Sequence, residues 1–201
     1  MTIAEPRPPS LASSTVTVLA PLRIEALALR RGAPDARVVH TGKGSDAAPD
    51  TAGALVVAGF AGALAGDVEP ATVVIADEVA GPDGDALECD ATLAADLAAA
   101  GLSVRVGRIA TARRIVRRGG RARLAETGAL AVDMESYWLR QAAGHRRFAV
   151  ARVVVDTPDR ELANPLATLR GGLAAYRTLR QAARWLAAWH PSTLDEPDRH
   201  D

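Results

Sequence analysis

The sequence predicts an α/β fold with three layers, in which a mainly parallel sheet lies between two layers of helices. Short apolar runs alternate with segments of helical periodicity along most of the chain. Several of these runs are continuously apolar, as expected for strands buried on both faces of a parallel sheet. The 201 residues, 48% of them hydrophobic, suit one domain, which we expect at 15–190 between tails at 1–14 and 191–201.

The predicted elements follow in order. The β-branched segment 15–20 predicts the first strand, and 24–31 has helical spacing that ends at Gly32. The other strands are predicted at 36–41, 54–59, 71–76, 102–108, 128–133 and 148–156. The other helices are predicted at 91–101, 136–144 and 166–190, the last from leucines spaced along one face.

Composition argues against several classes of function. The formal net charge is zero, which gives no electrostatic preference for nucleic acid or an acidic membrane. Cys89 is the only cysteine, so neither an intrachain disulfide nor a cysteine-based metal site can form, and the four histidines lack ligand spacing. No segment is apolar over the ~20 residues of a membrane span. We therefore expect a cytoplasmic protein without a metal.

Acidic residues follow three of the predicted strands, as Asp77-Glu78, Asp133-Met134-Glu135 and Asp156. The carboxyl ends of parallel strands meet at one edge of a sheet, and α/β proteins bind their ligands there. The sequence therefore predicts a site at this edge.

Asp156 ends the apolar run VARVVVD, which predicts a central strand. A carboxyl group at that point would be partly desolvated, and could hold a proton near neutral pH and act as an acid. The alternative is a helix N-cap, because Thr157-Pro158 predicts a turn.

Residues 131–136, AVDMES, place two carboxylates one residue apart where a strand meets a helix. Glu135 at the helix N-terminus would be favoured as an anion and could accept two hydrogen bonds from hydroxyl groups. The alternative is a capping acid without a ligand. Met134 by itself would be core filler.

Two glycine-rich turns are less specific. Gly42-Lys43-Gly44 could direct backbone N–H groups at a phosphate, or could be only a tight turn. The stretch GFAGALAG at 59–66 follows a strand but lacks the GxGxxG spacing of a dinucleotide site. A nicotinamide-dependent oxidoreductase is therefore disfavoured.

Taken in order, the segments APLRIEA, HTGKG, VAGFAGALAGDVEPATVVIADEV, AVDMES and VARVVVDTPD resemble the nucleoside phosphorylase/nucleosidase superfamily. This group contains 5′-methylthioadenosine/S-adenosylhomocysteine nucleosidase and purine nucleoside phosphorylase. The resemblance covers most of 15–189, and AVDMES is its most specific match. It implies a mixed, partly barrel-like sheet, cleavage of the N-glycosidic bond of a nucleoside without a cofactor, and a homo-oligomer.

The resemblance also implies roles for individual residues. Asp156 would protonate N7 of the departing base, and Glu25 would activate the nucleophile. Glu135 would bind the ribose hydroxyls with Met134 against the sugar, while Asp133 would be structural. The implied base-binding residues are Phe60, Ala61, Gly62, Arg114 and Ile115, and the implied phosphate ligands are Arg23, Gly42 and Lys43.

Within the superfamily, ATARRIV, LAETGALAVDMES and VARVVVDTPD are most similar to the hopanoid-associated phosphorylases. That similarity implies release of adenine from adenosylhopane, with phosphate as co-substrate. Gly81 to Asp90 is short where nucleosidases carry a loop over the substrate, and only residues 45–53 stand where the family has a full helix. Phe60 also stands in place of a small serine.

The short loop would leave the 5′ side open to a bulky apolar group. A hydrolytic nucleosidase and an inactive nucleoside-binding homologue are the alternatives.

Overall fold

The computed structural model describes residues 15–157 and 165–190, so the expected tails at 1–14 and 191–201 lie outside the described residues. The strands are β1 (Thr17–Ala20), β2 (Arg37–His40), β3 (Leu55–Ala63), β4 (Val73–Ile75), β5 (Glu78–Ala80), β6 (Ala86–Glu88), β7 (Val104–Val106), β8 (Ile109–Thr111), β9 (Ala131–Asp133) and β10 (Phe148–Asp156). The helices are α1 (Arg23–Gly32), α2 (Leu93–Ala99), α3 (Arg118–Ala125), α4 (Ser136–Ala143) and α5 (Pro165–Ala187).

All ten described strands form one mixed, mainly parallel sheet, as the sequence predicts. Its main path runs β6-β5-β8-β9-β3-β10-β4-β7, and β1 joins β3 to β2. Of the nine pairings among the described strands, only β10–β4, β3–β9 and β5–β6 are antiparallel. The long strand β3 is the centre of the sheet, since it pairs with β1, β9 and β10.

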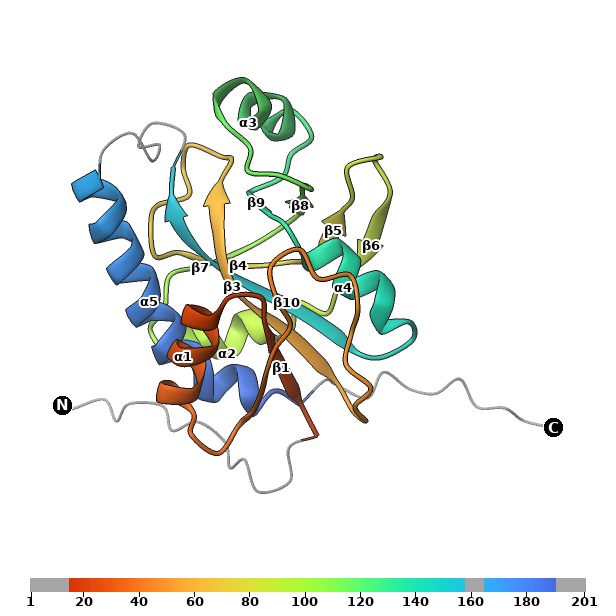
Figure 1. Ribbon diagram of the computed structural model, residues 1–201. Helices are drawn as coiled ribbons and strands as arrows, with labels where there is room; N and C mark the ends of the chain where they lie inside the picture. The colour runs from red at the N-terminus through yellow and green to blue at the C-terminus, as the bar shows by residue number, and fades with distance from the viewer. Residues whose placement is uncertain (1–14, 158–164, 191–201) are drawn as a thin grey trace.

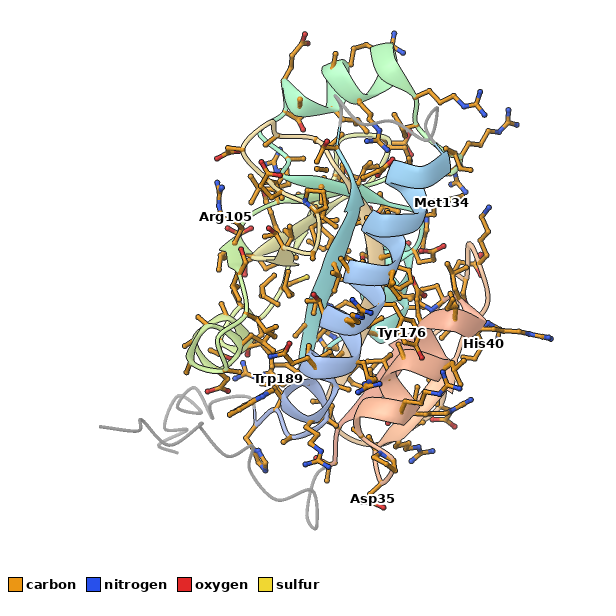
Figure 2. The ribbon with its side chains drawn as sticks, turned by 90° about the vertical axis from the view of Figure 1, so that its left-hand side faces the viewer. Asp35, His40, Arg105, Met134, Tyr176 and Trp189 are labelled. Atoms are coloured by element: carbon orange, nitrogen blue, oxygen red, sulfur yellow. The ribbon has the colours of Figure 1, made fainter. Side chains whose placement is uncertain are left out.

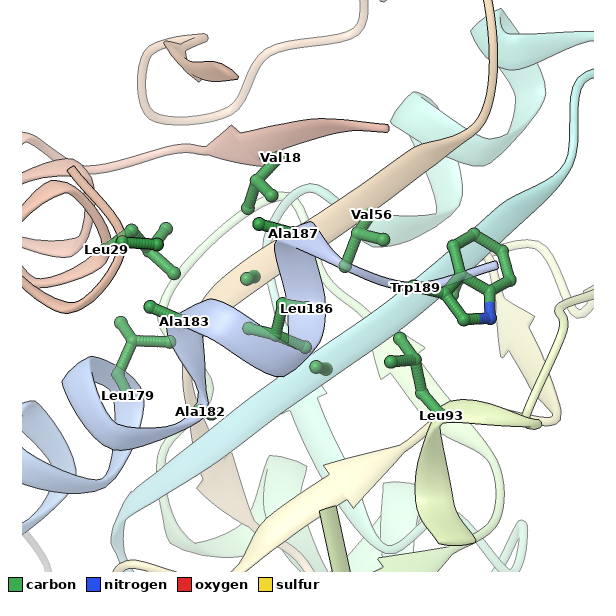
Figure 3. Packing of buried hydrophobic residues seen from close by; sticks show 14 of the residues in the cluster. Val18, Leu29, Val56, Leu93, Leu179, Ala182, Ala183, Leu186, Ala187 and Trp189 are labelled. Carbon is green, nitrogen blue, oxygen red and sulfur yellow. The ribbon is translucent and has the colours of Figure 1, made fainter. Parts of the chain in front are cut away.

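Helices cover both faces of the sheet (Figure 1). On one face α1, α2 and α5 enclose an apolar core in which Leu179 and Leu186 of α5 pack with Val18 and Val56 of the sheet (Figure 3). The other face packs against α4, through Tyr137 and Leu139. A third, small cluster at Leu64 and Val132 supports α3, which lies beyond the ends of β8 and β9 in Figure 1.

Four short elements were not predicted. The segment 102–108, expected to be one strand, contains only β7, and the chain then enters β8 beside β5 and β9. Residues 81–85, within the stretch expected to be a short substrate loop, join β5 to β6 as an antiparallel hairpin at the end of the strand path. α3 follows the arginine-rich segment 113–118, where no apolar periodicity marks a helix.

Strand register brings the predicted site residues together. β3 and β10 run in parallel, with Arg152 opposite Gly59 and Asp156 opposite Gly62. Gly62 is also paired with Val132 of β9, directly before Asp133. An irregularity between Val154 and Asp156 shifts the register at the end of β10, which is a common device for re-aiming a side chain beside a site.

Candidate active site

A cavity of about 220 Å³ opens at the carboxyl ends of β3 and β10. Four carboxylates line it, namely Glu25, Asp133, Glu135 and Asp156, together with Arg121. Met134, another lining residue, lies toward the upper end of the molecule in Figure 2, where α3 also lies. The site expected from the acids at the strand ends is therefore present, although Asp77 and Glu78 do not line it.

Glu25 lies in the first turn of α1 and is 1% exposed. Its carboxylate accepts hydrogen bonds from the backbone N–H of Leu22 at 2.6 Å and of Phe60 at 2.7 Å. Burial raises the pKa of Glu25 to about 7, against the lowering effects of Arg152 and the two backbone N–H groups. A carboxyl group with this pKa can accept and release a proton at neutral pH.

Arg152 is fully buried in β10 and joins two of the acids. Its guanidinium pairs with Asp133 at 2.6 Å and with Glu135 at 3.5 Å. Its Nη1 has no hydrogen-bond partner among the described residues, and a Cβ at Gly59 would lie 2.6 Å from this atom and overlap Glu25 Oε1. Arg152 and Glu25 therefore approach each other across the space that Gly59 leaves empty.

Asp133, for which the resemblance implies a structural role, makes several contacts within the protein. It is 5% exposed, accepts a hydrogen bond from Thr111 Oγ1 at 2.7 Å, and is bonded to the backbone N–H and hydroxyl group of Ser136. With the Arg152 ion pair, these contacts tie the end of β9 to α4 and β10. They fix the backbone from which the next acid projects.

Glu135 occupies the N-cap position of α4, as the sequence predicts, and is 6% exposed. Its Oε1 accepts a hydrogen bond from the backbone N–H of Gly44 at 2.9 Å. The glycine turn at 42–44 therefore directs an N–H group at a carboxylate of the protein itself. Both Glu135 and Met134 line the cavity.

Asp156 is buried at 5% exposure, as expected for the end of a central strand. It forms an ion pair with Arg121 of α3, with 2.6 Å between Oδ2 and Nη2. This partner lies 35 residues away in the sequence and was not predicted. The helix that Asp156 was alternatively expected to cap would fall at 158–164, outside the described residues.

The five residues expected at the base all line the cavity. They are Phe60, Ala61, Gly62, Arg114 and Ile115. The structure does not bring the three expected phosphate ligands together at the cavity. Lys43 lines it, whereas Arg23 and Gly42 do not. Arg23 is exposed on the first turn of α1.

Two buried arginines of the site, Arg121 and Arg152, were not predicted from the sequence. Arg152 could have been found, because it is the only charged residue in the apolar strand AVARVVV. A charge buried in such a strand needs a buried partner of opposite charge. Arg121 had no comparable signal, because it is one of six arginines at 113–123 and the others give no periodic pattern.

Within the part of the chain that the structure describes, no group of three or more His, Cys, Asp or Glu residues is arranged to hold a metal ion. No helix of that part has the length and hydropathy needed to cross a membrane.

Comparisons with known proteins agree with this fold. A family model described as the phosphorylase superfamily matches residues 24–184. The structure of a Campylobacter jejuni 5′-methylthioadenosine/S-adenosylhomocysteine nucleosidase is similar at a TM-score of 0.73 and 15% identity, covering 87% of this chain and 97% of the nucleosidase. The structure of the Streptococcus pneumoniae MTA/SAH nucleosidase in complex with 8-aminoadenine is similar at a TM-score of 0.67 and 21% identity. The match covers 87% of this chain and 98% of that nucleosidase.

A futalosine hydrolase mutant of Helicobacter pylori gives a TM-score of 0.67 and 14% identity, covering 86% of this chain and 96% of the hydrolase. No curated protein matches the chain by sequence. At such low identities the solved structures show a shared fold, whereas the family model matches most of the chain itself. The chain therefore belongs to the phosphorylase superfamily.

Proposed function

We propose that this protein cleaves the N-glycosidic bond of an adenine nucleoside. The observation that carries the proposal is the convergence of Glu25, Glu135 and Asp156 on one cavity, each buried and each from a different element. The names of the similar structures, nucleosidases and a futalosine hydrolase, support the same type of reaction. The expected roles of the three acids then fit their positions.

Glu135 is assigned to the ribose. Cleavage builds positive charge on the sugar, and a carboxylate that holds the hydroxyl groups stabilises that charge more as it develops. Oε1 is steadied by Gly44 and Oε2 by Arg152, so the carboxylate is held in place before the substrate arrives. Met134 lines the cavity beside it, as expected for a residue against the sugar.

Glu25 is assigned to the nucleophile, and the geometry favours water. With a pKa of about 7, its carboxylate can take a proton from water as the oxygen attacks C1′, while the electron pair of the C1′–N9 bond passes to the base. Arg23, expected to bind phosphate, is exposed and outside the cavity lining, and the Gly44 N–H is already bonded to Glu135.

Phosphorolysis is the second candidate. Lys43 lines the cavity and provides a positive charge near the sugar side, where a phosphate would have to attack.

The 5′ substituent is assigned as a large apolar group, with adenosylhopane as the specific candidate. The cavity is smaller than the ~300–1,000 Å³ usual for drug-sized ligands, so a long substituent would have to project through the mouth. Apolar side chains, among them Leu22, Val155 and Ile115, line the cavity, and Ile115 is 58% exposed.

The test is release of adenine from 5′-methylthioadenosine, S-adenosylhomocysteine and adenosylhopane, each with and without phosphate. We expect adenine and a free sugar product without phosphate, and the highest kcat/KM for the long apolar substrate. A strict requirement for phosphate, with a sugar 1-phosphate product, would mean that phosphate is the nucleophile instead of water. Methylthioadenosine as the best substrate would remove the hopanoid assignment, and binding of nucleosides without any turnover would indicate an inactive homologue.

A further inference from the structure

A groove of about 600 Å³ lies where the end of α1 packs beside the second half of α5 (Figure 1). The chain as a whole has 24 basic and 24 acidic residues, yet four of the six described residues that line the groove are arginines and none is an acid. Positive charge is therefore concentrated at this place. The lining residues are Arg31, Gly32, Arg177, Arg180, Gln181 and Arg184.

The groove is separate from the candidate active site, with which it shares no lining residue. A Cβ at Gly171 of α5 would overlap the backbone oxygen of Val155, a residue of the active-site cavity. A Cβ at Gly32 would overlap the backbone oxygen of Arg180, so the end of α1 rests directly on α5 at the groove. Gly171 and Arg180 are nine residues apart, which is roughly 14 Å along a helix.

The three arginines of α5 share one face of the helix. Arg177, Arg180 and Arg184 are spaced three and four residues apart, so they project from the same side over roughly 10 Å of helix. All three are exposed, and none has a side-chain hydrogen bond or ion pair with a described residue. The sequence of α5 contains no acid that could pair with them.

Arg31 adds a fourth cation from the neighbouring helix. It is the last arginine of α1 and donates a hydrogen bond from Nη1 to the hydroxyl group of Tyr176 at 3.0 Å. This contact holds its side chain against α5 while its other N–H groups stay available. The groove is thus lined by guanidinium groups from two helices whose packing fixes their backbones.

This arrangement suits an anion with several phosphate groups. Like charges on neighbouring turns of a helix destabilise it, and an anion between them removes that repulsion. The planar fork of N–H donors of a guanidinium matches the oxygens of a phosphate. A phosphate monoester carries a charge of about −1.5 to −2, so two such groups balance four cations. Gln181 supplies an amide that can also donate to a phosphate oxygen.

We propose that this groove binds a ligand with two or more phosphate groups, held by Arg31, Arg177, Arg180 and Arg184. The ligand is a soluble oligophosphate compound or the phosphate headgroups of a lipid surface, which present the same chemistry. The site is independent of the cleavage reaction proposed above, so either assignment can fail without the other.

The experiment measures the binding of inorganic tripolyphosphate to the full chain by isothermal titration calorimetry at physiological ionic strength. We expect the wild type to bind, and Arg180→Gln with Arg184→Gln to weaken the affinity by on the order of tenfold or more, because charge-assisted hydrogen bonds are lost. Without ligand, this double variant should melt at the same temperature as the wild type or higher, because the repulsion between the arginines is reduced.

Two variants serve as controls. Arg37→Gln with Arg123→Gln removes the same charge from exposed positions that do not line the groove, so it should bind tripolyphosphate like the wild type. Lys43→Gln changes a residue of the active-site cavity and should also leave this binding unchanged. The second control separates the groove from a phosphate bound as a co-substrate.

Vesicles distinguish the two sources of phosphate. The wild type and the Arg180/Arg184 variant are sedimented with vesicles of phosphatidylcholine, with and without phosphatidic acid. Binding of the wild type alone, and only to vesicles with phosphatidic acid, would identify lipid headgroups as the ligand. Binding of tripolyphosphate without binding of vesicles would identify a soluble compound.

Two results would overturn the proposal. A wild type that binds neither tripolyphosphate nor the vesicles with phosphatidic acid would show that the groove holds no phosphate ligand. Equal weakening in the Arg180/Arg184 and Arg37/Arg123 variants would show only a general attraction between the anion and the protein surface.

Discussion

At the scale of single residues, the pKa of Glu25 is set by the opposite effects of burial and of its hydrogen-bonding and charged partners. Burial opposes its charge most strongly, while Arg152 and the two backbone N–H groups favour the charge. The result is a carboxyl group that titrates near pH 7, where a base for a water nucleophile is most effective. Its titration therefore has consequences for both activity and stability.

For activity, kcat/KM should rise with pH as Glu25 loses its proton near pH 7 and becomes the base. Glu25→Gln has no group that titrates there, so this rise should disappear and kcat should fall by on the order of 10²–10⁴-fold. The measurement is a pH profile of adenine release for both proteins. A variant that keeps the wild-type profile would show that Glu25 is not the base.

For stability, the same group should oppose folding at high pH. The pKa of Glu25 is about 7 in the folded protein against a reference of 4.5, so the folded state binds the proton more tightly. The stabilising contribution of Glu25 to the free energy of unfolding is fully present below pH 4.5 and is lost as the pH rises through about 7. The difference of about 2.5 pKa units, at ~1.36 kcal/mol each, corresponds to about 3 kcal/mol.

Denaturant unfolding of wild type and Glu25→Gln between pH 4.5 and 8 tests this point. The free energy of unfolding of the wild type should fall relative to that of the variant across this range. Parallel curves would contradict the raised pKa.

Glu135→Gln should weaken both ribose binding and turnover. The amide can still accept from Gly44, but it carries no charge to stabilise the ribose cation or to pair with Arg152. We expect a higher KM and a kcat lower by on the order of 10²-fold, with a smaller loss on a 2′-deoxy substrate, which lacks one of the hydroxyl groups. Glu69→Gln, a change at an exposed acid, is the control. Equal losses on the ribose and 2′-deoxy substrates would argue against a hydroxyl contact.

At the scale of elements, β3 shows why a strand beside a site contains glycines. Gly59 and Gly62 have no left-handed backbone angle, so the requirement is for space rather than for backbone freedom. Gly59 makes room for Glu25 and Arg152, and Gly62 makes room for Arg121 and Asp156. The spacing of three residues places one glycine beneath each half of the site.

Gly59→Ala should therefore disrupt the ribose half of the site. The new methyl group would overlap Glu25 Oε1 and press on Arg152 Nη1, both buried, so we expect loss of activity and a destabilisation of about 1–3 kcal/mol. Gly66→Ala is the matched control, because a Cβ there meets nothing within 4 Å. Steady-state kinetics and thermal melts of the two variants decide the matter, and an active, stable Gly59→Ala would contradict the described packing.

At the scale of the whole molecule, apolar side chains are exposed on adjacent helices. Ile24 is 54% exposed and Leu27 44% exposed on α1, and Leu173 is 49% exposed on α5. These two helices pack together, with Arg31 of α1 donating to the hydroxyl group of Tyr176 of α5 at 3.0 Å (Figure 2 labels Tyr176). Apolar residues that gather into one exposed patch are typical of an association surface.

We expect the protein to form a homo-oligomer through this α1–α5 surface. Leu27→Glu should shift the protein toward the monomer in sedimentation equilibrium, because a charge would be buried on association. Val106→Glu is the control, since Val106 is similarly exposed, at 47%, on β7. A monomeric wild type, or equal effects of the two changes, would exclude association through this surface.

The sequence by itself determined the main fold and the location of the site. The strand at 148–156 and the first half of β3 were predictable because a run of apolar residues has few other stable environments. The second half of β3, to Ala63, was wrongly interpreted as part of a glycine-rich turn at 59–66, because its glycines are needed for space beside the site and carry no strand pattern. The same logic placed Glu135 at a helix N-terminus and Asp156 at a strand end, and the rule for α/β ligand sites then predicted their common edge.

Only the tertiary structure decided the partners of these acids and the shortest elements. β5, β6 and β8 have three residues each, too few for a periodic pattern, and they form because neighbouring strands offer hydrogen bonds. Arg152 and Arg121 meet Asp133 and Asp156 through strand register and helix packing, across 19 and 35 residues of sequence. A local pattern shows how much of a segment is buried but not which charge it will face, so only the fold decided the ion pairs of the site.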